Sequence, residues 1–177
     1  MEVKDSEICF AKIRETAVVP TKKDEDAGYD LYANFDADYF VIEPFATRAV
    51  PTGIACAFNK KFYAQVEERS SLAKLGIKKS GGVMDSGYRG EYLIMTYNTN
   101  KKPFIISKIP LDNVPPKIRI DSKTYKTKNC VLYPYAKAIC QIVLQEIPAL
   151  VSKEVSYEEL KSIVSLRGEG GFGSSSK

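Results

Sequence analysis

Gly81-Gly82-Val83-Met84-Asp85-Ser86-Gly87-Tyr88-Arg89-Gly90-Glu91, followed by the apolar run Tyr92–Asn98, is the stretch that decides the fold. Apolar Val83 and Met84 run into Asp85, and a Ser-Gly turn then leads to Tyr88. Glycine-containing turns between apolar runs are typical of β-hairpins. We therefore expect a β-hairpin with Asp85 and Tyr88 near its tip.

This hairpin is either a plain structural turn or part of a binding site. Glycine-lined backbone can hydrogen-bond the edge of a planar ligand, because no Cβ keeps the ligand away. A Tyr88 ring could lie against a sugar, and Asp85 could orient or deprotonate a water. In the structural alternative Asp85 is only a turn residue and Tyr88 packs across the strands.

The rest of the chain continues as short apolar runs that end at proline or glycine. The strands expected are Ile8–Ile13, Tyr39–Ile42, Arg48–Phe58, Phe62–Val66, Tyr92–Asn98, Phe104–Ile106 and Ala138–Ile147. Many short strands favour an all-β barrel or sandwich. One short helix is expected over Ser70–Leu75, with Ser70 as N-cap and Gly76 as its stop. Ser156–Val164 is a second helix candidate through a Ser156/Glu159 capping box, although its end could equally be a strand.

Composition restricts the chemistry. The 177 residues suffice for one domain with a core, and the net charge of +4 is too mild to require nucleic acid or a membrane. The chain has no histidine, which removes Ser-His-Asp, Cys-His and His-ligated metal sites. Four cysteines without metal-like spacing suggest a reducing compartment, the cytosol or the nucleus. We expect no signal peptide and no membrane span.

Two segments stand apart in composition. Residues 108–129 hold three prolines and a net charge of +4, so they form either a solvated surface insertion or a basic flap for an anionic partner. Residues 167–177 hold four glycines, Arg167 and Phe172, with no aliphatic side chain. They are either a disordered tail or a mobile arm over a nucleotide, since arginine binds phosphate and an aromatic ring stacks on a base.

Three further segments carry polar residues in suggestive places. Arg69 precedes a serine-rich helix start, which is either an ordinary surface turn or a phosphate site. Asp30, inside Ala27–Ala33, is a turn residue or a partner for Arg69. Gln141, in the middle of the apolar run Ala138–Val143, is structural or holds a water and a phosphate oxygen.

In their order, five segments resemble the five motifs of the homotrimeric deoxyuridine triphosphatases (dUTPases). They are AGYDLYA (27–33), RSSLAKLGI (69–77), GGVMDSGYRGE (81–91), AICQIV (138–143) and RGEGGFGSSS (167–176). The resemblance implies a jelly-roll-like β-barrel over residues 1–166, a C-terminal arm over 167–177, and a trimer with shared active sites. It implies hydrolysis of dUTP to dUMP and pyrophosphate by water attack at the α-phosphate, which keeps uracil out of DNA and supplies dUMP.

The resemblance also implies the role of each site residue. Asp85 holds the attacking water and contacts the 3′-hydroxyl, and Tyr88 packs on the deoxyribose. Uracil lies against Gly82, Val83, Met84 and Leu93, with Lys79 where some members have Asn. The phosphates meet Arg69, Ser70 and Ser71 of a neighbouring subunit, and Gln141 supports the water. The arm closes the site through Arg167, Phe172, Gly173 and Ser174. Mg²⁺ comes with the triphosphate, and Asp30 could reach it through a water.

Departures from the motifs leave two alternatives. Ser71, where the family usually has Gly, gives the form also seen in dCTP deaminases, so a deaminase or a bifunctional deaminase/dUTPase is the second enzyme considered. The complete arm argues against a simple deaminase. A non-catalytic regulator on the same fold, binding a partner through residues 108–129, is opposed by the intact Asp85, Tyr88 and Arg167.

Overall fold

Short strands joined by proline- and glycine-containing turns make up most of the protein. The computed structural model describes residues 3–170. The strands are β1 (Ile8–Lys12), β2 (Tyr29–Leu31), β3 (Tyr39–Ile42), β4 (Thr47–Val50), β5 (Ile54–Phe58), β6 (Phe62–Glu67), β7 (Ile77–Lys79), β8 (Val83–Met84), β9 (Ile94–Asn98), β10 (Phe104–Ser107), β11 (Lys117–Ile120), β12 (Lys123–Lys126), β13 (Val131–Pro134) and β14 (Cys140–Glu146). The helices are α1 (Ser70–Ala73), α2 (Tyr157–Ser162) and the 3-10 turns η1 (Leu111–Asn113) and η2 (Thr127–Asn129).

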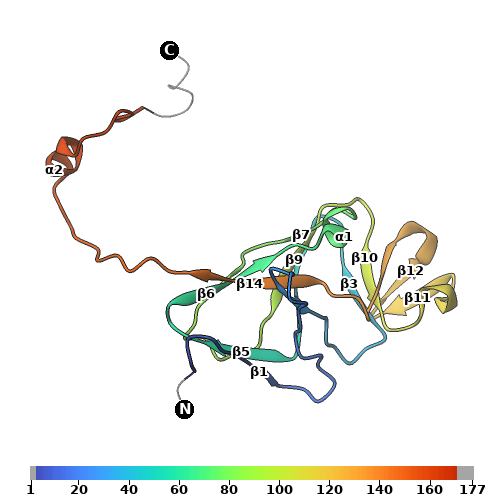
Figure 1. The fold of residues 1–177 in the computed structure, drawn as a ribbon. Helices are drawn as coiled ribbons and strands as arrows, with labels where there is room; N and C mark the ends of the chain where they lie inside the picture. The colour runs from blue at the N-terminus through green and yellow to red at the C-terminus, as the bar shows by residue number, and fades with distance from the viewer. Residues whose placement is uncertain (1–2, 171–177) are drawn as a thin grey trace. The chain divides into compact units, whose positions relative to one another are not determined.

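The chain forms two compact units, Met1–Ile147 and Pro148–Lys177. The first unit holds all the strands, arranged in small sheets around one core (Figure 1). An antiparallel sheet has the order β2-β14-β6-β8, a second has β4-β9-β7, and a third, β13-β10-β3, includes the parallel pair β10–β13. This all-β, jelly-roll-like architecture confirms the predicted fold class.

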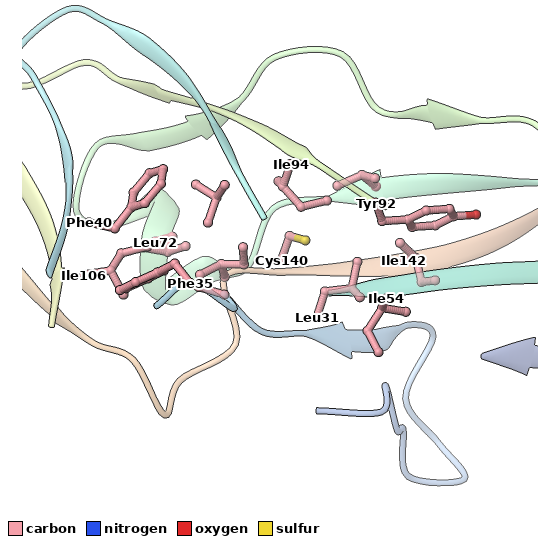
Figure 2. Close-up of a cluster of buried hydrophobic side chains, with 14 of the residues drawn as sticks. Leu31, Phe35, Phe40, Ile54, Leu72, Tyr92, Ile94, Ile106, Cys140 and Ile142 are labelled. Atoms are coloured by element: carbon pink, nitrogen blue, oxygen red, sulfur yellow. The ribbon is translucent and has the colours of Figure 1, made fainter. Parts of the chain in front are cut away.

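The core of the first unit is filled by alternate side chains of these strands. In β5 and β9 every second residue is buried, as the period of a strand with one face on the core requires. Figure 2 shows Leu31, Ile54, Cys140 and Ile142 converging in this cluster. Cys56 and Cys140 are buried there as predicted, and burial raises the pKa of the Cys140 thiol to about 12.

The predicted strand Arg48–Phe58 is two strands in different sheets. β4 pairs with β9, whereas β5 pairs with β1. Gly53 has a φ of 67° between them, and a Cβ at this position would lie 2.9 Å from the Cβ of Ala17. Because an L side chain rarely adopts this conformation, Pro51 and Gly53 end one strand and redirect the chain into the next.

The basic segment 108–129 is not the loop that its prolines suggested. It contains the antiparallel hairpin β11–β12, in which Ile118 faces Tyr125. These two side chains are buried in a second cluster with Val41 and Ile105, so the hairpin packs on β3 and β10 (Figure 1). The prediction missed this pair because two apolar residues among many lysines give only a weak strand pattern.

The hairpin is also tied to the sheet by polar contacts. The carboxylate of Glu43 accepts hydrogen bonds from Lys123 Nζ at 2.8 Å and from the Tyr125 hydroxyl at 2.7 Å. The bond from Lys123 is the main cause of the lowered pKa of Glu43. The segment is therefore a fixed part of the first unit.

The second unit contains the predicted capping box. Ser156 Oγ accepts a hydrogen bond from the Glu159 backbone N–H at 3.1 Å, and Glu159 Oε2 accepts one from the Ser156 N–H at 2.8 Å. The reciprocal pair starts α2, and Ile163, in extended conformation, ends it. The helix alternative is thus confirmed for residues 157–162. Across residues 3–170, no helix combines the length and the apolar character that a bilayer crossing requires.

Candidate functional site

Three polar residues meet where β2, β14 and β6 run side by side. Asp30 lies opposite Gln141, and Gln141 lies opposite Glu67, so the three form one row across the sheet. Arg69 follows β6 directly, and its guanidinium forms an ion pair with the Asp30 carboxylate. Both side chains remain about one-third exposed, at 36% and 27%. The partner role predicted for Asp30 is confirmed, and the row presents a cation to solvent at the end of β6.

The helix start after Arg69 differs from the prediction. The N-cap of α1 is Arg69 and not Ser70, its side chain makes no capping hydrogen bond, and α1 spans only four residues. Buried Leu72 anchors this single turn, whereas Ser70 and Ser71 are exposed. Because neither hydroxyl is used as a cap, both stay accessible beside Arg69.

Gly28 determines where the Gln141 side chain can lie, and it was missed as a site residue. A Cβ on Gly28 would come within 2.8 Å of Gln141 Oε1 and 3.1 Å of its Cβ and Cγ. The amide Nε2 of Gln141 also donates to the Glu68 carbonyl at 3.5 Å. The signal in the sequence was a glycine two residues before the acid of a strand, a position typical of close approach by another side chain.

A second polar region surrounds a hollow of about 200 Å³ between β6, β7, β8 and β9. Its lining comprises Val66, Lys79, Ser80, Gly81, Gly82, Val83, Met84, Leu93, Ile94 and Met95. The five uracil-side residues named from the sequence, Lys79, Gly82, Val83, Met84 and Leu93, all line it. Ser80, Gly81 and Met95 were missed, because their side of the hollow forms only when β7 pairs with β9.

Glycine backbone forms one wall of this hollow. The Gly82 carbonyl accepts from the Val66 N–H at 2.7 Å, and the Ser80 N–H donates to the Met95 carbonyl at 2.7 Å. A Cβ on Gly82 would approach Lys79 Nζ at 3.0 Å and the Val66 carbonyl oxygen at 3.1 Å. Any side chain at Gly82 would therefore crowd the wall.

The ammonium of Lys79 is held at this wall. It donates to the Val66 carbonyl and lies 3.4 Å from a carboxylate oxygen of Glu67. The Lys79 side chain is only 21% exposed, so its position is well constrained.

The segment expected as a hairpin has a different pairing. β8 adds to β6 rather than to β9, and β9 pairs with β7 on one side and β4 on the other. Asp85 and Tyr88 lie in the connection between β8 and β9, where the Tyr88 N–H donates to the Asp85 carbonyl at 3.1 Å. The turn near Asp85 is confirmed, but the two arms that we expected to pair belong to different sheets.

One chain does not bring the two polar regions together. In the β6–β8 register Met84 faces Ala64, so Asp85 is level with Tyr63, whereas Asp30 is level with Glu67. With a rise of roughly 3.3 Å per residue and a strand spacing of roughly 4.8 Å, Asp85 lies roughly 20 Å from the Asp30–Arg69 pair. A carboxylate side chain cannot span that distance.

The arm is only partly visible to this description. Arg167 lies in the second unit, where its Nε donates to the Gly170 carbonyl at 2.6 Å. The other three arm residues named from the sequence, Phe172, Gly173 and Ser174, lie outside the described residues. The expected boundary at 166/167 stays a prediction, and the division between the two units falls earlier, at Ile147/Pro148.

No ready-made metal cage was found in residues 3–170, because no three His, Cys, Asp or Glu side chains there are grouped to bind one ion. Asp30, the one acid considered for a water-mediated contact with Mg²⁺, has its carboxylate engaged by Arg69.

Comparison with known proteins agrees with this geometry. The family model described as dUTPase matches residues 14–109. The deoxyuridine 5′-triphosphate nucleotidohydrolase of Debaryomyces hansenii is 34% identical over 92% of this chain and 83% of its own, and that of Candida albicans is 34% identical over 90% and 81%. The dUTPase of Staphylococcus bacteriophage 80alpha, solved with dUpNHpp, is similar with a TM-score of 0.70 and 25% identity, over 96% of this chain and 98% of the phage chain.

Proposed function

Because this chain belongs to the dUTPase family, we propose that it hydrolyses dUTP to dUMP and pyrophosphate by attack of water on the α-phosphate. The observation that supports this most directly is the hollow beside Lys79–Met84, whose rim continues into the turn that holds Asp85 and Tyr88. A pyrimidine ring fits a volume of about 200 Å³, and its sugar then leaves toward Tyr88 and Asp85. The base is read by backbone groups and the reaction occurs just beyond it.

We place the catalytic work on the chain's own charges. Asp85 is exposed and can accept a hydrogen bond or a proton from the attacking water. Arg69, oriented by Asp30, offers positive charge to the phosphates, and Gln141 supplies an amide beside it. Phosphoryl transfer depends chiefly on positioning and on neutralising charge, so one carboxylate with a fixed cation suffices.

Mg²⁺ is treated as part of the substrate. Its role is to neutralise triphosphate charge, and the protein contributes Asp30 at most through a water, since Arg69 already occupies that carboxylate. A structural Mg(II) ion is described for the dUTPase of phage phi11, which is 20% identical to this chain, so only the fold is shared with confidence in that case.

We propose that the complete site forms between subunits of a homotrimer. The support is the separation of roughly 20 Å between Asp85 and the Arg69–Asp30 pair within one chain, estimated from strand spacing. The Arg69 of a neighbouring subunit would then meet the nucleotide held at Asp85. Light scattering should give about three times the chain mass of 19.7 kDa. A fully active monomer would contradict the shared site.

Product analysis separates this activity from that of a deaminase. Incubation with dUTP should release pyrophosphate and dUMP, whereas a deaminase would convert dCTP to dUTP and ammonia. Asp85→Asn should reduce the single-turnover rate by about 10²–10⁴-fold while dUTP still binds, because an amide cannot accept the water's proton. A loss below about tenfold would be too small for a general base.

We further propose that the β11–β12 hairpin binds an acidic segment of a protein partner. Lys117 lies directly opposite Lys126, and neither of them forms an ion pair within residues 3–170. Like charges in this arrangement are unfavourable, and an anion on the outer face would relieve them. That face carries Lys117, Arg119, Thr124 and Lys126, with no aromatic ring on which a nucleic-acid base could stack.

The hairpin proposal can be tested with a labelled Glu-rich peptide and a single-stranded oligonucleotide of equal charge. The peptide should bind at near-physiological salt and lose binding in Lys117→Glu/Lys126→Glu. Tighter binding of the oligonucleotide, or no binding of the peptide, would contradict the proposal.

A further inference from the structure

We propose that Gly90 and Tyr92 form a seat that holds the Tyr88 ring in place, and that this seat sets the discrimination between deoxyribose and ribose. The proposal rests on the proposed function, in which the Tyr88 ring packs on the sugar. It assigns the discrimination to two residues that contact the ring rather than the nucleotide, so both are positioning residues.

Gly90 provides the room in which the ring lies. A Cβ on Gly90 would come within 2.4 Å of the Tyr88 hydroxyl oxygen, 2.6 Å of Cζ and 3.0 Å of Cε2. Gly90 does not have a positive φ, so its backbone conformation accepts alanine. Alanine at this position therefore conflicts with the Tyr88 ring and with little else.

Tyr92 provides the surface against which the ring lies. The two rings are stacked, with centroids 6.2 Å apart and an interplanar angle of 28°. Tyr92 is fully buried, whereas Tyr88 is 44% exposed. Figure 2 shows Tyr92 at one end of the core cluster, with its hydroxyl pointing away from Leu31 and Ile54. The seat thus connects an exposed ring to the core of the first unit.

The hydroxyl of Tyr92 does not account for its presence. It is buried and has no hydrogen-bond partner in the described structure, an arrangement that typically costs about 1–3 kcal/mol. Phenylalanine would avoid that cost and would fill the same volume with a ring. The part of Tyr92 that serves the seat is therefore the ring, and Tyr92→Phe is a matched control for any variant that removes it.

The seat itself is held firmly. The backbone of Tyr92 donates to the Ile54 carbonyl at 2.8 Å and accepts from Thr52 Oγ1 at 2.8 Å. Glu91 Oε1 accepts from the Gly53 N–H at 2.7 Å, and the Glu91 carbonyl accepts from the Tyr88 hydroxyl at 3.1 Å. Gly90, Glu91 and Tyr92 therefore enclose the ring and leave its remaining face for the sugar.

The consequence is steric. A ring that is held in one position against the sugar excludes a 2′-hydroxyl, whereas a ring that swings freely does not. Because the ring is nearly half exposed, displacing it should change specificity much more than stability.

The test compares four variants by the ratio of kcat/KM for dUTP to kcat/KM for UTP. Tyr88→Ala sets the full effect of losing the ring. Gly90→Ala and Tyr92→Leu should each lower the ratio by about tenfold or more, equivalent to about 1.4 kcal/mol. Tyr92→Phe should leave it within about twofold of the wild-type value. Gly90→Ala combined with Tyr88→Ala should be no worse than Tyr88→Ala alone, because the ring with which the methyl group conflicts is gone.

The outcomes separate the seat from the proposed function. If Tyr88→Ala narrows the ratio but Gly90→Ala does not, the seat is refuted and the role of Tyr88 stands. If Tyr88→Ala leaves the ratio unchanged, the sugar role of Tyr88 fails and the seat with it.

Ring contacts in NMR spectra of the ligand-free protein give a readout that needs no activity. Nuclear Overhauser contacts between the Tyr88 and Tyr92 rings should be present in the wild type and lost in Gly90→Ala. Their persistence in folded Gly90→Ala would refute the seat, even if Tyr92→Leu proved too unstable to purify.

Discussion

Two inactive chains should restore activity when they assemble together. Asp85→Asn removes the carboxylate beside the base hollow, and Arg69→Ala removes the cation paired with Asp30. Each variant alone should be inactive. A trimer that contains both would have sites in which an intact Asp85 of one chain meets an intact Arg69 of another.

The magnitude follows from the separation within one chain. Since Asp85 and the Arg69–Asp30 pair lie roughly 20 Å apart along and across the β2-β14-β6-β8 sheet, no site can draw both groups from the same chain. In a cyclic trimer with random assembly from equal amounts, about one quarter of the sites receive both intact residues. Pyrophosphate release should therefore recover to about one quarter of the wild-type rate.

Co-expression of the two variants with different affinity tags, followed by tandem purification, supplies the mixed trimers. The control is a chain that carries both substitutions, co-expressed with Asp85→Asn, because no site in that mixture has an intact carboxylate. Tandem-purified mixed trimers with no more activity than this control would show that the site lies within one chain, and the reasoning from strand register would be wrong.

Three other predictions follow from the described contacts. Gly28→Ala should displace the Gln141 side chain, lower the single-turnover rate and destabilise the first unit by about 1–3 kcal/mol, as overpacking does, and Gln141→Ala in the same chain should relieve the destabilisation in chemical denaturation. Glu43→Gln should destabilise by about 1–2 kcal/mol at neutral pH. Because the pKa of Glu43 is lowered, its contribution is present above its ordinary value of 4.5 and is lost as the pH falls through the lowered value, so wild type and variant should converge in acid denaturation. Truncation after Leu166 should leave the melting temperature within about a few degrees and reduce turnover strongly, since it removes Arg167 and Phe172 but no aliphatic side chain; a truncated chain with full kcat would exclude an arm that closes the site.

Several features could be predicted from the sequence because they depend on neighbours along the chain. Alternating apolar residues decide which face of a strand is buried, so the all-β class and most strands could be predicted. The capping box of Ser156 and Glu159 depends on four consecutive residues. The residues at the base hollow were found because the glycines and Asp85 lie within one motif.

Strand pairing was different, because it depends on residues far apart in the chain. The sequence by itself determined that Val83–Met84 and Tyr92–Asn98 would be strand-like, but β8 joins β6 and β9 joins β7 and β4. A ladder hydrogen bond has no sequence specificity of its own, so local pattern cannot choose the partner. The same limit hid the packing of Ile118 and Tyr125 under the basic hairpin.

The sequence alone therefore determined which side chains perform the chemistry, since Asp85, Arg69, Gln141 and Tyr88 are recognisable by type and spacing. Only the tertiary structure decided their distances: Asp30 and Arg69 in contact, Gln141 against Gly28, Tyr88 on Tyr92, and Asp85 far from Arg69. The physical reason is that side-chain type is a local property of the chain, whereas the distance between two side chains is set by strand order and register, which the whole core selects by burying one face of every strand.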